Sequence, residues 1–99
     1  MADIADLARD ALRQVFDPEA GLNIVDLGLI YDIAAEDGAV TITMTFTNEG
    51  CPAGPLLMDL ARQAVTSVTG VREAVVNLTF EPPWTPDSIS PDGRALLGG

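Results

Sequence analysis

The chain has 99 residues, with 15 acidic and 5 basic side chains, no histidine and one cysteine. This length predicts a single domain over residues 1–99. A lone cysteine excludes an internal disulfide. One cysteine cannot build a four-thiolate zinc site, and no histidine is present to complete one or to form a histidine-based catalytic triad. The net charge of −10, with five scattered arginines and no lysine, argues against nucleic acid and anionic membranes as partners.

The N-terminal residues lack the basic and apolar regions of a secretory signal. No apolar run approaches the roughly 18 residues needed to span a bilayer. Together with an unpaired thiol, these features predict a cytoplasmic protein.

Residues 3–16 are predicted to form an amphipathic helix. Apolar side chains recur at spacings of three and four residues, and Asp3 is suited to cap the first turn. Pro18 disfavours helical geometry at Asp17, and Gly21 permits a turn, so we expect the helix to end here.

Residues 29–35 and 40–47 are predicted to form a β-hairpin around Asp37-Gly38, a dipeptide typical of two-residue hairpin turns. This loop places four pairs of apolar residues on one face, as a half-buried hairpin requires. The expected pairs are Ala35 with Val40, Ile33 with Ile42, Tyr31 with Met44 and Leu29 with Phe46. The alternate threonines at 41, 43, 45 and 47 are expected on the other face.

Residues 53–69 are predicted to form a second helix that ends at Gly70, and residues 71–80 a third strand. In the tail, residues 81–99, Ser90-Pro91 is suited to open a short helix that Gly98 closes. The order α-β-β-α-β plus a tail predicts an α+β fold, a two-layer sandwich with both helices on one face of the sheet.

Cys51 is the candidate reactive residue. If Pro52 opened the second helix, Pro55 would remove a helix hydrogen bond, whereas a helix that starts at Ala53 avoids this loss. Cys51 then lies just before the helix, where free amides and the helix dipole stabilise a thiolate. A thiolate binds soft metals and iron–sulfur clusters. Judged by position alone, a small buried residue is an equally good interpretation of Cys51.

Two carboxylates and one aromatic residue are weaker candidates. Glu19 follows Pro18 in a turn, and Asp26 precedes the first hairpin strand. Acidic residues in turns usually bond nearby backbone amides, which is the structural interpretation of both. Trp84 is more often a cover on the core than a ligand-stacking ring.

The arrangement of these residues resembles the small iron–sulfur assembly domain family of SufT, PaaD and a eukaryotic cytosolic iron–sulfur assembly component. The resemblance extends over about residues 5–98. The matching segments are Asp17-Pro18-Glu19, residues 24–31, Thr45-Phe46-Thr47, Gly50-Cys51-Pro52, Gly70-Val71, Pro82-Pro83-Trp84 and residues 94–98.

This resemblance implies an αβ domain that helps to mature iron–sulfur proteins, with Cys51 as the functional thiol and Asp26 near it. The matched Thr47, Gly50, Pro52 and Trp84, together with Glu19, are supporting candidates. PaaD is expected to carry a longer, cysteine-rich C-terminal extension, so the sequence is closer to the stand-alone assembly form.

Our leading hypothesis is a non-enzymatic factor in iron–sulfur cluster assembly or transfer to client proteins. Cys51 would be one ligand to iron or to a cluster, held transiently. A cluster takes about four ligands, so a second subunit, the assembly machinery, a client apoprotein or a small thiol must supply the others.

Two alternatives belong to other functional classes. The first is a metal-free interaction module that docks a partner or a second copy through one sheet face. This face would carry Ile30, Asp32, Ala34, Thr41, Thr43 and Thr45. The second is a small thiol- or carboxylate-dependent enzyme, against which the absence of histidine counts.

Overall fold

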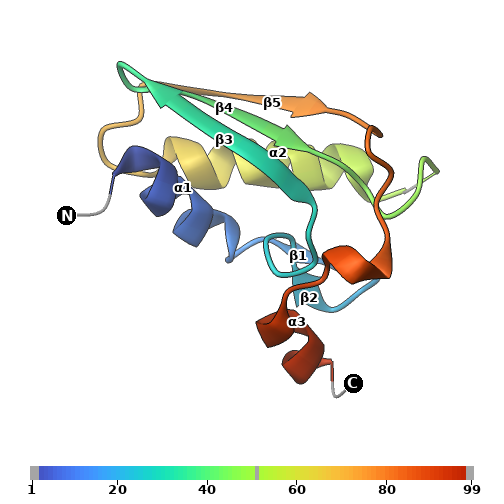
Figure 1. Cartoon of the computed structure of the whole chain (residues 1–99). Helices are drawn as coiled ribbons and strands as arrows, with labels where there is room; N and C mark the ends of the chain where they lie inside the picture. Colours follow the sequence, from blue (N-terminus) through green and yellow to red (C-terminus); the bar gives the residue numbers. More distant parts are fainter. Residues whose placement is uncertain (1–2, 51, 98–99) are drawn as a thin grey trace.

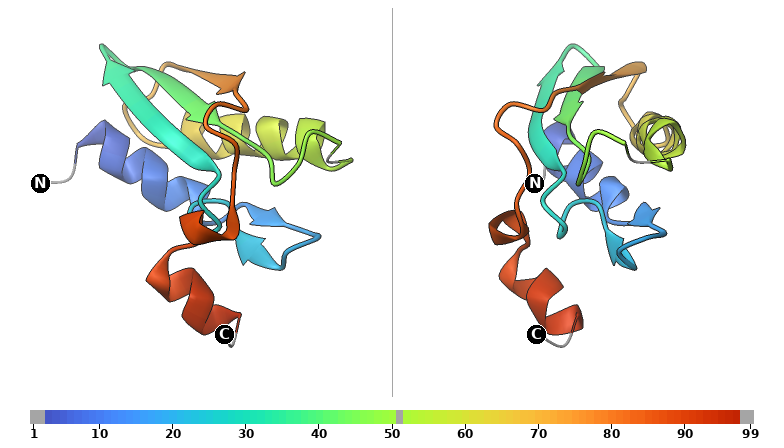
Figure 2. Two further views of the ribbon diagram at one scale, coloured as in Figure 1. Left: turned by 45° about the vertical axis from the view of Figure 1, so that its right-hand side comes forward. Right: turned by 90° about the vertical axis from the view of Figure 1, so that its right-hand side faces the viewer.

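Two helices cover one face of a three-stranded sheet, and the C-terminal tail passes on the other side of the sheet (Figures 1 and 2). The computed structural model describes residues 3–50 and 52–97. In chain order the elements are α1 (Ile4–Leu12), β1 (Phe16–Asp17), β2 (Leu22–Asn23), β3 (Ile30–Glu36), β4 (Ala39–Met44), α2 (Gly54–Thr66), β5 (Glu73–Leu78), the 3₁₀ helix η1 (Pro86–Ser88) and α3 (Pro91–Leu96). The α+β fold predicted from the sequence is confirmed.

The central strand β4 organises the sheet. It pairs antiparallel with β3 and parallel with β5, and α2 makes the crossover between β4 and β5. Along β4, Val40, Ile42 and Met44 are fully buried against the helices, whereas Thr41 and Thr43 point to the opposite face and are half-buried. This alternation is the expected signature of a strand with one face in the core.

The core lies between the inner face of the sheet and the two longer helices. Its side chains come mainly from α1, from β2 and the turn before β3, from β4 and from α2. The largest fully buried apolar side chains are Leu12, Leu22, Ile24, Leu27, Leu29, Ile42, Met44 and Leu57.

The hairpin has the predicted turn and half of the predicted register. Asp37 and Gly38 both have positive φ, at 52° and 85°, as a two-residue primed turn requires. The pairs Ala35–Val40 and Ile33–Ile42 are found as predicted.

The predicted pairs Tyr31–Met44 and Leu29–Phe46 are wrong. A β-bulge between Ile30 and Asp32 shifts the register, so Ile30 pairs with Met44. Tyr31 is the extra residue, and its hydroxyl donates to the Pro82 carbonyl oxygen of the tail at 2.7 Å. Tyr31 therefore bonds the tail and does not take its predicted position on the core face.

The first helix is shorter than predicted. It ends at Leu12 rather than at residue 16, because the amides of Gln14 and Val15 bond the carbonyls three residues back and tighten the chain into turns. The following Phe16–Asp17 strand pairs with Leu22–Asn23 in a small sheet that the sequence analysis did not predict.

The second helix and the third strand are both shorter than predicted, and differ from the prediction only at their ends. The second helix starts at Gly54 and ends at Thr66, and the third strand covers only Glu73–Leu78. Thr45, expected on the outer face, is fully buried beyond the end of β4, where its amide donates to the Leu29 carbonyl oxygen at 2.8 Å. Ser90 caps α3 as predicted, whereas Gly98, the expected end of this helix, lies outside the described residues.

Within the ranges that the structure describes, every helix is too short or too polar to cross a bilayer.

Candidate functional site

The candidate site is the segment that connects β4 to α2, which we call the 47–53 loop. Figure 1 shows this loop projecting from one end of the molecule, at the N-terminus of α2. Thr47 is half-buried, and Gly50 and Pro52 are exposed. Cys51 lies outside the described residues, so its predicted role is addressed through its neighbours in the chain.

The start of α2 agrees with the sequence argument to within one residue. Ala53 is the N-cap, Gly54 is the first helical residue, and Pro55 occupies the second position, where its missing N–H costs no helix bond. Within residues 3–50 and 52–97, no side chain caps this N-terminus. The free amides and the positive end of the helix dipole therefore face the 47–53 loop, where they favour a negative charge.

A tight contact between Phe46 and Gly54 fixes the two ends of the loop. Phe46 is 6% exposed, and its ring meets the Phe80 ring edge-on, with centroids 6.1 Å apart and an interplanar angle of 72°. A Cβ atom at Gly54 would lie 2.4 Å from the Phe46 ring, so only glycine fits. Phe46 was expected to pair with Leu29, and its contact with Gly54 was not predicted from the sequence. The one available signal was a glycine flanked by Ala53 and Pro55 at a helix start.

Asp26 is held by hydrogen bonds on both carboxylate oxygens. The Asn23 side-chain amide donates to Oδ2 at 2.7 Å, and the Ser90 hydroxyl donates to Oδ1 at 2.9 Å. The Ser90 amide also donates to the Asp26 carbonyl oxygen at 2.8 Å. Asp26 therefore ties the tail to the turn before β3.

These contacts change the acidity of Asp26. The hydrogen bond from Asn23 is the largest cause that lowers the pKa of Asp26 below its ordinary value. The Ser90 hydrogen bond and the charge of Arg13 lower it further, against an opposing effect of burial. The Asp26 side chain is therefore ionised near neutral pH.

Trp84 covers the core, as the structural interpretation expected. Its indole N–H donates to the Leu27 carbonyl oxygen at 2.8 Å, and its half-buried ring packs against the core. Gly28, which follows Leu27, has a φ of +87°. A Cβ atom at this position would lie 2.3 Å from the Ser88 carbonyl oxygen, so the tail approaches the backbone closely here. The Asp26-Leu27-Gly28 motif is therefore a docking point for the tail.

Glu19 lies in a turn that is organised by Asp17. The Asp17 side chain is buried, at 1% exposed, and its Oδ1 atom accepts from the Glu19 amide at 2.8 Å, whereas Glu19 itself is exposed. From the sequence, Asp17 was expected at the end of the first helix and in a motif, but not as a buried side chain. Its role here is to close the turn between β1 and β2.

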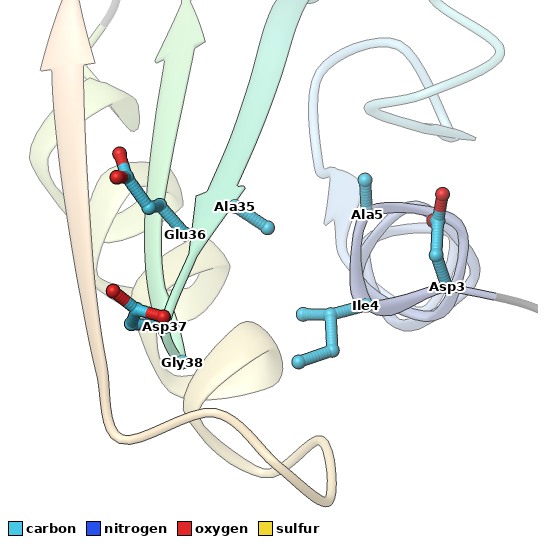
Figure 3. A pocket seen from close by; sticks show the side chains of 7 residues that line it. All are labelled: Asp3, Ile4, Ala5, Ala35, Glu36, Asp37 and Gly38. Atoms are coloured by element: carbon cyan, nitrogen blue, oxygen red, sulfur yellow. The ribbon is translucent and has the colours of Figure 1, made fainter.

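The described carboxylates do not assemble a metal site by themselves. Among residues 3–50 and 52–97, no group of three or more acidic or thiol side chains is placed to hold a metal ion. A hollow of about 470 Å³ lies between the start of α1 and the hairpin turn and includes Asp3, Glu36 and Asp37 (Figure 3). It is at the opposite end of the molecule from the 47–53 loop (Figure 1).

Comparison with known proteins matches residues 6–78 to the family described as iron–sulfur cluster assembly protein. The chain belongs to this family. The resemblance inferred from the motifs is confirmed.

Relatives match along most of their own length. The chain is 44% identical to the Fe-S protein maturation auxiliary factor YitW of Bacillus subtilis, over 89% of this chain and 87% of YitW. It is 39% identical to the Fe-S protein maturation auxiliary factor SufT of Staphylococcus aureus, over 85% of this chain and 97% of SufT. The names of both relatives describe auxiliary factors and not enzymes.

A solved structure supports the fold. The crystal structure of a domain of unknown function, DUF59, from Bacillus anthracis superposes with a TM-score of 0.90 at 35% identity. The match covers 96% of this chain and 92% of that one.

The Phe46–Gly54 contact predicts that Gly54→Ala lowers the free energy of unfolding by about 1–3 kcal/mol, because the added methyl group overpacks the helix start. The matched control is Gly50→Ala, where a Cβ atom would meet nothing closer than the Asn48 side chain at 3.6 Å. We expect the control to change stability by less than about 0.5 kcal/mol. Urea unfolding followed by circular dichroism checks both values. Equal losses would contradict the packing argument.

The lowered pKa of Asp26 predicts a pH-dependent contribution to stability. Because the pKa is lower in the folded state, the contribution is complete above the unfolded-state pKa of about 4 and is lost as the pH falls through the folded-state value. Unfolding followed by Trp84 fluorescence should show that Asp26→Asn is less stable than wild type at pH 7, with a gap that closes on acidification. Ser90→Ala removes one of the two side-chain bonds to Asp26 and also the cap of α3, which does not titrate. Its loss of stability relative to wild type should therefore change less with pH than that of Asp26→Asn. A gap that does not change with pH would refute this.

Proposed function

We propose that this protein is a non-enzymatic, cytoplasmic accessory factor in iron–sulfur cluster assembly or transfer to client proteins, with Cys51 as its functional thiol. Family membership over residues 6–78 and the names of relatives that match along most of their length support the general role. The finer assignment to Cys51 rests on its position in the chain.

The observation that carries this assignment is the start of α2. Gly50 and Pro52, on either side of Cys51, are both exposed, and α2 begins three residues after Cys51. A helix of 13 residues, with no side-chain cap among the described residues, favours an anion at this place. Of the two acidic groups in the 47–53 loop, Glu49 and Cys51, only the Cys51 thiolate is the soft sulfur ligand that binds iron.

The chain supplies one thiolate, and a cluster takes about four ligands. In this proposal, iron or a cluster is therefore cargo that is shared with a client, with a second subunit, with the assembly machinery or with a small thiol. Asp26 has a structural role in this proposal, because both of its carboxylate oxygens already accept hydrogen bonds from Asn23 and Ser90. The 47–53 loop that contains Cys51 includes Thr47, Gly50 and Pro52. Trp84 covers the core, and Glu19 lies in the turn between β1 and β2.

A metal-free interaction module is the second candidate function. The face of the sheet opposite the helices favours it, because Asp32, Ala34 and Val75 are exposed there. The two functions are compatible, since a carrier must also dock on its client.

Cys51→Ser should fold normally and fail to support client maturation. The hydroxyl group is nearly isosteric, but its oxygen is a hard donor that stays protonated near neutral pH. The measurement is complementation of a strain that lacks the endogenous factor, with the activity of an iron–sulfur enzyme as the readout. Circular dichroism checks the fold.

The double variant Cys51→Ser/Ser67→Cys is the matched control. It keeps one thiol per chain but moves it to the exposed C-cap of α2, so it should also fail. Full maturation by folded Cys51→Ser would overturn the thiol assignment. Rescue by the double variant would show that a thiol is needed but not at the helix start.

A further inference from the structure

The sheet has one face without helices. Because paired residues of neighbouring strands share a face, the side chains opposite the core follow from the register. Across the middle of this face lie Ala34, Thr41 and Val75, and the acidic residues Asp32, Glu36 and Glu73 lie around them. We call these six residues the open face.

The open face is accessible. Val75 is 47% exposed, Ala34 is also exposed, and Thr41 is half-buried. Figure 2 shows both long helices on the other side of the sheet, and the tail passes only one end of the open face. A hollow of about 390 Å³ at the hairpin end includes Ala34, Glu36 and Thr41. Figure 3 shows Glu36 pointing away from α1, on the opposite side of β3 from Ala35.

The charge of the open face is not neutralised within the described chain. The ion pairs among residues 3–50 and 52–97 join Arg13 to Asp10, Arg62 to Asp59 and Arg94 to Asp87, all away from this face. Arg72 lies next to the hairpin turn, with its side-chain carbons against Gly38, and forms no ion pair with the described acidic residues. The three carboxylates therefore present a negative rim around a centre formed by Ala34, Thr41 and Val75.

We propose that the open face docks a basic segment of a partner protein. Charge complementarity selects this partner, because Lys and Arg side chains can reach the rim while the backbone of the segment lies on the small central residues. A second copy of this chain is disfavoured, since it presents the same acidic residues and the same net charge of −10. Nucleic acid and anionic lipid are repelled for the same reason.

This proposal names the partner class for the second candidate function, on which it rests, and does not depend on the role of Cys51. The open face is a separate surface from the 47–53 loop and carries no thiol. A binding measurement that uses no iron tests it, so its failure would leave the proposed maturation role standing.

The experiment titrates isotope-labelled protein of residues 1–99 with a synthetic dodecapeptide of alternating lysine and alanine. A peptide with glutamate in place of lysine is the negative control. We expect the largest amide shift changes in β3, β4 and β5 at Ala34, Thr41 and Val75, and weaker binding at higher salt concentration. Shift changes centred on α1, on α2 or on the tail, or no binding at all, would overturn the proposal.

Two matched triple variants test the surface directly. Asp32→Asn/Glu36→Gln/Glu73→Gln should weaken binding about eightfold, about twofold for each exposed contact. Asp6→Asn/Asp10→Asn/Asp92→Asn removes the same total charge from α1 and α3 and should weaken binding less than about twofold. Equal losses would mean that net charge alone attracts the peptide, which would overturn the proposal. Sedimentation that shows a dimer dissociated by the first triple variant would also overturn it, in favour of a second copy.

Discussion

The contact between the Phe46 ring and the backbone of Gly54 is the constraint on which the candidate site depends. Phe46 continues from the buried central strand, and Gly54 is the first residue of α2, so their contact fixes the distance that the 47–53 loop must span. The ring of Phe80, which follows β5 in the chain, packs edge-on against the Phe46 ring. The loop is thus supported by two regular elements, which is how proteins commonly present reactive residues on exposed segments.

The tail contributes a second constraint from the other end of the sequence. Ser90 bonds Asp26, the Trp84 indole bonds Leu27, and a buried glycine, Gly93, lets α3 approach the carbonyl oxygen of Asp26 closely. The carboxylate of Asp26 therefore helps to hold the tail against the turn before β3. A search for metal ligands would assign the Asp26 carboxylate a role in metal binding, whereas these contacts give it a structural role.

Local signals predicted much of the fold, and contacts distant in sequence account for what they missed. The Asp37-Gly38 turn and the alternation along β4 are local, and both are found. Tyr31 left its predicted place because it bonds Pro82, 51 residues away, and Asp26 is fixed by Ser90, 64 residues away. Periodicity carries no information on such partners. The start of α2 was predictable from its prolines, whereas Cys51 itself remains a prediction from sequence and family.

Iron binding by the protein itself tests the central claim most directly. The protein would be incubated without oxygen with ferrous iron, sulfide and glutathione, separated by gel filtration, and analysed for iron and acid-labile sulfide. Our account predicts that iron and sulfide elute with the wild-type protein and are absent from Cys51→Ser, because the single thiolate is the ligand that the chain contributes. Wild-type protein that elutes free of iron and sulfide, or a variant that retains as much of both as wild type, would contradict it.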